Sequence, residues 1–196
     1  GCRFIHISTD YVFQGTSSEP YTEEDETSPI NVYGASKLAG EKGILEVLGD
    51  KATIVRTSSL HGKYGANFVH TMLELFSARE KVSVVSDQIM SPTWAGWLAG
   101  VLLDLCRIEE GGIFHACSEG ALSWFEFAKA IADFADDDFD VEIEPVPAST
   151  FPRPAPRPAY SVMSCEKLSK VLGRKPLSWD DGLKRHLRDI GRIKGA

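Results

Sequence analysis

The chain has only four cysteines, and none of them forms a Cys-x-x-Cys pair. Cys2, Cys106, Cys117 and Cys165 are scattered along 196 residues. This spacing argues against a zinc site or a disulfide framework and favours free thiols in a reducing compartment. No apolar run is long enough to span a bilayer, and no signal peptide opens the chain. We therefore expect a cytoplasmic protein that does not bind a membrane.

An excess of positive charge is also missing. The chain carries 21 Lys and Arg against 28 Asp and Glu, which gives a net charge of −7 and a pI of about 5.3. This balance argues against a nucleic-acid partner, because no basic patch is available to neutralise phosphates. A hydrophobic content of 43% over 196 residues is enough for one globular domain or two small lobes.

A helix with a tyrosine and a lysine is the most informative feature that is present. Segment 31–48 has apolar residues at helical spacing, with Asn31 as a cap and Gly49 as a stop. Tyr33 and Lys37 are four residues apart and share one face. An ammonium near a phenol lowers the pKa of the phenol, so this pair can exchange a proton near neutral pH. Alternatively, the tyrosine is half-buried and the lysine is solvated.

A β-strand precedes this helix. Segment 3–8 alternates and is rich in β-formers, and it leads directly into Thr9 and Asp10. Ligands of open parallel sheets bind beyond the carboxyl ends of the strands, which places Ser8, Thr9 and Asp10 where chemistry is expected. Thr9 is then able to hydrogen-bond the same substrate oxygen as Tyr33.

The rest of the chain alternates between strand and helix patterns, which predicts an α/β fold. The expected strands are 52–57, 81–86, 113–116 and 141–146, and the expected helices are 67–79, 94–107, 123–134, 165–172 and 179–190.

Five segments together resemble a known family. STDYVFQG, PYTEEDETSPINVYGASKLAGE, VRTSSLHGKYGANFVHTMLELF, VSVVSDQIMSPTW and RPAYSVMSCEKLSKVLG are similar to the extended short-chain dehydrogenase/reductases, and most of all to the dTDP-4-dehydrorhamnose reductases. The resemblance covers nearly the whole chain in order. It implies the C-terminal part of a Rossmann-like doubly wound parallel sheet with a smaller α/β substrate-binding lobe. Residues 1–85 would belong to the nucleotide-binding domain and 86–196 mainly to the lobe, with 94–116 returning to the first domain.

The family's Gly-rich turn, Gly-x-x-Gly-x-x-Gly, is absent from the chain. Gly62 and Gly65 lie in a later loop, after a different strand. If the resemblance holds, we expect the sequence to start at about the fifth strand of the sheet, downstream of the pyrophosphate-binding turn.

The resemblance implies reduction of a nucleotide-linked 4-keto-6-deoxysugar with NADPH or NADH, in the synthesis of deoxysugars for cell-surface polysaccharides. Tyr33 would protonate the sugar oxygen, Lys37 would lower the pKa of Tyr33 and hold the nicotinamide ribose, and Thr9 would orient the carbonyl.

The family's binding residues map onto two further sets of positions. The cofactor would contact Ser8, Tyr33, Lys37, Arg56 and Thr57. The substrate would contact Asp10, Tyr11, Asn67, Phe68, Gln88, Pro92, Thr93 and Arg157. From the residues alone, Asn67 is equally a helix cap, Phe68 a core residue and Arg157 a solvated arginine. The chain departs from the family at Ser59, where tryptophan is usual, and at Met90, where glycine is usual.

Several alternatives remain open at this point. Glu23 or Glu24 could bind Mg²⁺ at a contact of a homodimer, although no metal site is defined by the sequence. His61 is a candidate acid–base residue or a plain hydrogen-bonding group. Epimerases and dehydratases for nucleotide sugars share Tyr33 and Lys37, but the resembling dehydratases carry Asp-Glu after the threonine, whereas this chain has Asp10-Tyr11. A non-catalytic regulatory subunit of the same fold is the other alternative.

Overall fold

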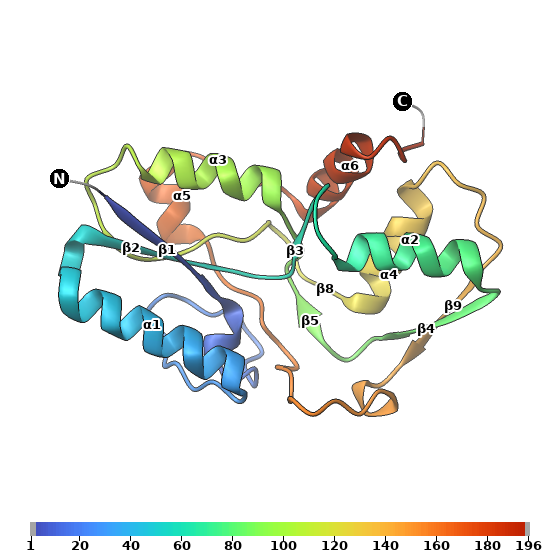
Figure 1. Ribbon diagram of the computed structural model, residues 1–196, viewed down its shortest axis with the longest axis horizontal. Helices are drawn as coiled ribbons and strands as arrows, with labels where there is room; N and C mark the ends of the chain where they lie inside the picture. Colours follow the sequence, from blue (N-terminus) through green and yellow to red (C-terminus); the bar gives the residue numbers. More distant parts are fainter. Residues whose placement is uncertain (1–2, 195–196) are drawn as a thin grey trace.

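The computed structural model describes residues 3–194 and shows two groups of elements side by side (Figure 1). Each group surrounds its own cluster of buried apolar side chains. Cys106, Cys117 and Cys165 are free thiols, as predicted, whereas the prediction for Cys2 lies outside the described residues. Among the helices of residues 3–194, none is long and apolar enough to cross a membrane.

The first group is built on a parallel sheet of three strands. These are β1 (Phe4–Thr9), β2 (Ala52–Thr57) and β7 (Gly112–His115), in the order β1-β2-β7. Helix α1 (Val32–Leu48) lies on one face of the sheet and α3 (Ala95–Leu105) on the other (Figure 1). The predicted α/β class with a doubly wound parallel sheet is therefore confirmed, and the three strands end at the same edge.

The second group packs helices against a pair of parallel strands. Strand β4 (Lys81–Val85) pairs with β9 (Glu142–Val146), and α2 (Phe68–Ala78) and α4 (Trp124–Phe134) pack on them. Helix α6 (Trp179–Asp189) closes the same apolar cluster, which contains its two buried leucines.

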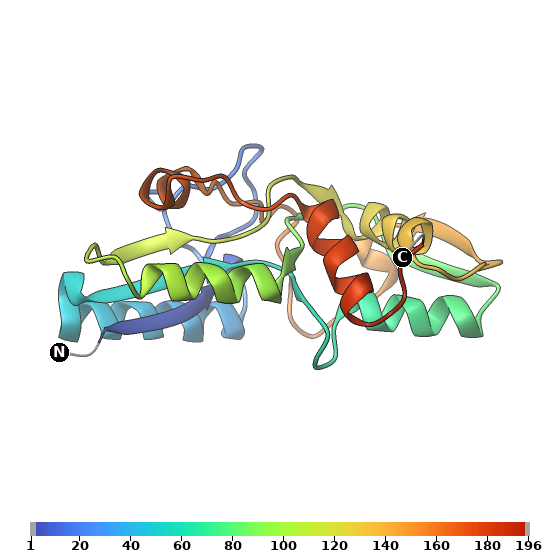
Figure 2. The ribbon, with the colours of Figure 1, turned by 90° about the horizontal axis from the view of Figure 1, so that it is seen from above.

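Short elements connect the two groups. Strand β3 (Leu60–His61) pairs with β6 (Thr93–Trp94), and β5 (Ile89–Met90) pairs with β8 (Leu122–Ser123). Helix α5 (Glu166–Leu172) returns to the first group and packs on β7; from above, it lies beyond the edge of the sheet (Figure 2). The remaining elements are the 3-10 helices η1 (Asp10–Val12), η2 (Gly49–Lys51) and η3 (Ala148–Thr150).

The ends of the helices follow local sequence signals. Asn31 caps α1 by accepting a hydrogen bond from Gly34 N at 2.8 Å, and Gly49 ends that helix at a φ of 57°. Ser123 and Glu126 form a capping box at the start of α4. The predicted Asn31 cap and Gly49 stop are confirmed because each depends only on residues within one turn of the helix end.

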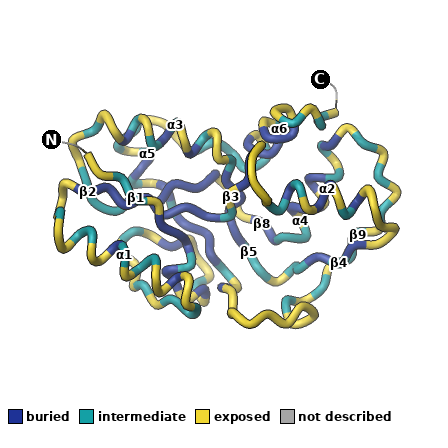
Figure 3. Tube along the Cα trace, in the orientation of Figure 1, coloured by how far each residue is buried: buried dark blue, intermediate teal, exposed yellow. Residues whose placement is uncertain are grey.

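The packing of α2 and β4 bears on the expected division at residue 85. Both elements precede that residue, yet their buried side chains belong to the cluster that also contains α4 and α6. The division itself stays a prediction, and the packing favours a boundary before α2. The buried residues concentrate where the strands of both groups end, in the middle of the molecule (Figure 3).

Candidate functional site

The carboxyl edge of the sheet holds a network of buried hydroxyl and carboxyl groups. Thr9 ends β1, and its Oγ1 accepts a hydrogen bond from Tyr11 N at 3.2 Å. Thr9 Oγ1 and Asp10 Oδ1 are 2.9 Å apart, and Ser58 Oγ donates to Asp10 Oδ2 at 2.9 Å. Burial raises the pKa of Asp10. The structure thus brings Thr9 and Asp10 together as one hydrogen-bonded unit.

Tyr33 and Lys37 lie on the open face of α1. The Tyr33 side chain is 54% exposed, and its ring meets that of Tyr11 edge-on, with centroids 5.9 Å apart. Lys37 Nζ donates to the carbonyl of Ile7 on the outer edge of β1 and lies 3.4 Å from His6 Nε2. Tyr33 thus lies beside Tyr11, which is hydrogen-bonded to Thr9, and the Lys37 ammonium reaches β1 two residues before Thr9.

Two further hydroxyls at this edge lack partners. Ser8 Oγ and Thr57 Oγ1 are buried, and neither makes a hydrogen bond within the described part of the chain. Leaving a buried hydroxyl unpaired costs free energy. These two expected cofactor residues are thus the ones with unused hydrogen-bonding capacity.

Arg56, also expected to contact a cofactor, is committed elsewhere. Its side chain is almost fully buried and forms an ion pair with Glu41 of α1, with Nη2 and Oε2 2.7 Å apart. The guanidinium also packs on the Phe13 ring, 5.2 Å from its centre. Because its charge is already paired with Glu41, Arg56 has a structural role here, and its contact with a cofactor stays a prediction. It joins β2 to the helix that carries Tyr33.

The acidic loop before α1 is not arranged as a metal site. Glu23 Oε1 accepts a hydrogen bond from His115 N at 2.8 Å. Within residues 3–194, no group of three or more His, Cys, Asp and Glu side chains is placed to hold a metal ion. The suggested Mg²⁺ ion therefore has no support, and Glu23 instead connects the loop to β7.

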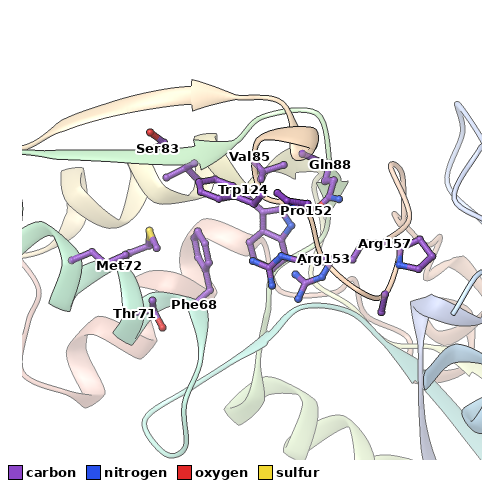
Figure 4. A pocket seen from close by; sticks show the side chains of 16 residues that line it. Phe68, Thr71, Met72, Ser83, Val85, Gln88, Trp124, Pro152, Arg153 and Arg157 are labelled. Atoms are coloured by element: carbon purple, nitrogen blue, oxygen red, sulfur yellow. The ribbon is translucent and has the colours of Figure 1, made fainter. Parts of the chain in front are cut away.

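A pocket of about 600 Å³ lies in the second group, lined by α2, β4, the start of α4 and segment 148–157 (Figure 4). It brings together three of the expected substrate residues, Phe68, Gln88 and Arg157. The Phe68 ring packs against Trp124, with centroids 4.7 Å apart. The other lining residues are Thr71, Met72, Leu75, Ser83, Val84, Val85, Ala148, Phe151, Pro152, Arg153, Ala155 and Pro156.

One pocket residue contacts the start of α1, because the carbonyl of Pro156 accepts a hydrogen bond from Asn31 Nδ2 at 2.9 Å. Burial raises the pKa of Tyr11, and the positive charges of Arg157 and Arg153 oppose that rise.

Three expected substrate residues lie outside the pocket, and two of them form hydrogen bonds within the protein. Asn67 caps α2 by accepting from Val69 N and His70 N, and it donates to the carbonyls of Gly62 and Gly65. Thr93 is buried and donates to the carbonyl of Ser91. Neither of them, nor Pro92, lines the pocket. For Asn67, the capping alternative is the one that the structure supports.

Sequence reasoning missed two pocket residues. These are Trp124, which begins α4, and Arg153, which lies in the segment after η3. The available signal was the segment 151–158 itself, because alternating prolines and arginines fix a cationic strand in an extended form.

His61 has a structural position rather than an open one. It is buried, and its Nδ1 lies 3.1 Å from His186 Nδ1 on α6. Burial lowers the pKa of His61 to about 3. A neutral imidazole held inside the protein is a poor candidate for acid–base work, so the plain hydrogen-bonding interpretation is favoured.

A parallel doubly wound sheet, a hydroxyl at the end of a strand and a following Tyr-x-x-x-Lys helix define the extended short-chain dehydrogenase/reductase class. Within that class, the chain belongs to the family of RmlD substrate binding domains, which matches residues 1–192. The expected resemblance is thereby confirmed.

Named relatives agree with this assignment. The spore coat polysaccharide biosynthesis protein SpsK of Bacillus subtilis is 39% identical over 96% of this chain and 65% of its own length. A dTDP-4-keto-6-deoxy-D-glucose reductase of Streptomyces niveus is 43% identical over 82% of this chain and 56% of its own. The chain thus spans less than two thirds of both relatives.

A solved structure shares the fold as well. The dTDP-4-dehydrorhamnose reductase of Bacillus anthracis, in complex with NADP, superimposes with a TM-score of 0.88 and 42% identity. The match covers 95% of this chain and 66% of that one.

Proposed function

We propose that the protein reduces the 4-keto group of a dTDP-linked 6-deoxysugar with NADPH. The observation that carries this proposal is the contact between the pocket and helix α1: Pro156 lines the pocket, and its carbonyl accepts a hydrogen bond from Asn31, the cap of the helix that carries Tyr33. Relatives named as reductases of such sugars support the substrate class, and the NADP complex of one of them supports the cofactor.

The pocket suits a nucleoside diphosphate. The Phe68 and Trp124 rings offer apolar faces for a base, and Gln88 offers an amide to its polar edge. Arg153 and Arg157 supply positive charge for a diphosphate in a chain whose net charge is −7. The sugar would then extend past Tyr11 toward Tyr33.

The residues at the sheet edge would carry out the proton chemistry. Tyr33 would donate its phenolic proton to the carbonyl oxygen, and Thr9 would hydrogen-bond that oxygen. Lys37 would move from the Ile7 carbonyl to a ribose hydroxyl and stabilise the phenolate that forms. The unpaired hydroxyls of Ser8 and Thr57 fit polar groups of a dinucleotide. When bound, NADPH supplies the hydride that reaches the carbonyl carbon.

The outer edge of β1 leaves room for further strands of the nucleotide-binding domain. Strand β1 is the outer strand of the sheet, and Phe4 and Ile7 on it are 44% and 41% exposed, although parallel sheets are usually buried. We infer that further parallel strands pair with this edge, as part of the domain that binds the cofactor.

Tyr33→Phe in the full-length protein tests the function. With NADPH and keto sugars derived from dTDP-4-keto-6-deoxyglucose, we expect turnover to fall by roughly 10²- to 10⁴-fold while the variant stays folded. Tyr64→Phe is the matched control, because Tyr64 is 86% exposed outside the site, and it should retain wild-type turnover. In the same assay Trp124→Ala should raise KM with little change in kcat.

Undiminished turnover by Tyr33→Phe would refute the catalytic role. A wild-type protein that binds the nucleotide sugar but never oxidises NADPH would favour the regulatory-subunit alternative. Release of a dehydrated or epimerised sugar would favour the other enzyme classes.

A further inference from the structure

The hydroxyl of Thr9 has a single hydrogen, and its neighbours decide where that hydrogen points. Thr9 Oγ1 accepts from Tyr11 N and lies 2.9 Å from Asp10 Oδ1. If Asp10 is a carboxylate, it only accepts, so the Thr9 hydrogen must point at Asp10. A ketone oxygen also only accepts. Thr9 then has no hydrogen left for the substrate.

Asp10 sits in surroundings that favour its neutral form. It is 3% exposed, and its side-chain partners are the hydroxyls of Thr9, Ser58 and Ser161. Burial raises its pKa more than these hydroxyls lower it. No cationic side chain of residues 3–194 forms an ion pair with it.

The titratable neighbours of Asp10 come from two elements. Tyr11 follows it in η1, and Cys117 lies just after β7; burial raises the pKa of Tyr11, and the hydrogen bond with Cys165 together with burial raises the pKa of Cys117. A phenol and a buried thiol are neutral at pH 7, so neither stabilises a carboxylate. The segments after β2 and around Ser161 contribute hydroxyls only.

We propose that Asp10 is a positioning residue that acts as a neutral carboxylic acid and donates its proton to a hydrogen bond with Thr9 Oγ1. Thr9 then directs its own hydrogen to the substrate carbonyl oxygen, while Ser58 donates to the second oxygen of Asp10. No bond forms or breaks at Asp10, and the transferred proton still comes from Tyr33. The proposal rests on the proposed function and adds to it a condition on the protonation of Asp10.

Asp10→Asn provides the sharpest test. The amide cannot ionise, and its NH₂ group can donate to Thr9 while its oxygen accepts from Ser58. We expect kcat/KM for the keto sugar to stay within about threefold of wild type near neutral pH. In the wild type, ionisation of Asp10 should lower kcat/KM as the pH rises, and this decrease should be absent from Asp10→Asn. Asp10→Ala should lose roughly 10- to 100-fold.

Two controls separate this role from a merely structural one. In a Thr9→Val background, Asp10→Asn should no longer alter the pH profile, because the group through which it acts is gone. Ser58→Ala removes a donor to the charged form, which raises the pKa of Asp10 and should shift the alkaline fall of kcat/KM to higher pH.

Infrared difference spectroscopy provides a readout that needs neither cofactor nor turnover. A titration across the neutral range should show the carbonyl band of a protonated carboxyl group, missing in Asp10→Asn. Absence of this band at every pH, or Asp10→Asn being as inactive as Asp10→Ala, would overturn the proposal. A wild-type protein with the band but without reductase activity would instead refute the proposed function and leave Asp10 shown to be neutral.

Discussion

Three buried histidines make the stability of this protein depend on pH. His61, His115 and His186 are all less than 3% exposed. Burial lowers the pKa of His61 and His115 to about 3 and that of His186 to about 4. Neighbouring groups add to this: His186 faces His61, and the Arg56 guanidinium lies beside His115. The folded protein therefore keeps all three imidazoles neutral well into the acid range.

The sign of the effect follows from the unfolded state, in which a histidine has a pKa of about 6.5. Below that value the unfolded chain takes up protons that the folded protein does not, so stability is full above about pH 7 and is lost as the pH falls toward about 4. At about pH 5 each histidine lowers the free energy of unfolding by about 2 kcal/mol. For the three histidines together, the slope of this free energy against pH approaches about 4 kcal/mol per pH unit. Asp10 has the opposite effect on stability, because its raised pKa lets the folded protein bind up to one proton more than the unfolded chain as the pH falls.

Urea unfolding followed by circular dichroism between about pH 7 and about pH 5 measures this slope. The expected total of about 6 kcal/mol is comparable with the whole stability of a typical domain, about 5–15 kcal/mol. His61→Asn removes one titrating group and should reduce the slope by about a third, whatever its effect on stability at pH 7. Equal stability at both pH values would refute the reasoning, because it would mean that the imidazoles ionise in the folded protein.

Two other predictions use matched variants of α1. Gly34→Ala would place a Cβ 2.1 Å from a backbone carbonyl of η1 and should destabilise by about 1–3 kcal/mol or more, whereas Gly43→Ala enters open space and should stabilise by up to about 1 kcal/mol. Glu41→Gln leaves the buried Arg56 charge unpaired and should cost about 3–5 kcal/mol, whereas the exposed Glu46→Gln should change stability by less than about 0.5 kcal/mol. Thermal and urea unfolding check both pairs. Equal effects within either pair would contradict the corresponding argument.

Local features of the fold were predictable from sequence. The Asn31 cap, the Ser123 capping box and the glycine stop at Gly173 each depend on contacts within a few residues. The parallel strands were also predictable, because apolar β-rich runs alternate with helical periods. Helices and strands can be predicted wherever the residues that determine them lie close together in the sequence.

Pairings between distant residues were not predictable in the same way. Arg56 meets Glu41 only because β2 packs on α1, and His61 meets His186 across 125 positions. The resemblance gave Arg56 as a cofactor residue, and the sequence offered no sign of its pairing with Glu41. Trp124 shows the opposite case. Its position on a helix made it resemble a core residue, whereas in the fold it lines the pocket together with segment 151–158.

One side chain connects the pocket to helix α1. Asn31 Oδ1 accepts from Gly34 N to cap α1, and Asn31 Nδ2 donates to the carbonyl of Pro156 at 2.9 Å. The same residue thus fixes the start of the helix that carries Tyr33 and the segment that carries Arg157. Because the prolines hold that segment extended, a shift of Arg157 upon binding a diphosphate would be passed to the end of α1 rather than absorbed by the loop. Recognition of the nucleotide and placement of the phenol would therefore be mechanically coupled through Asn31.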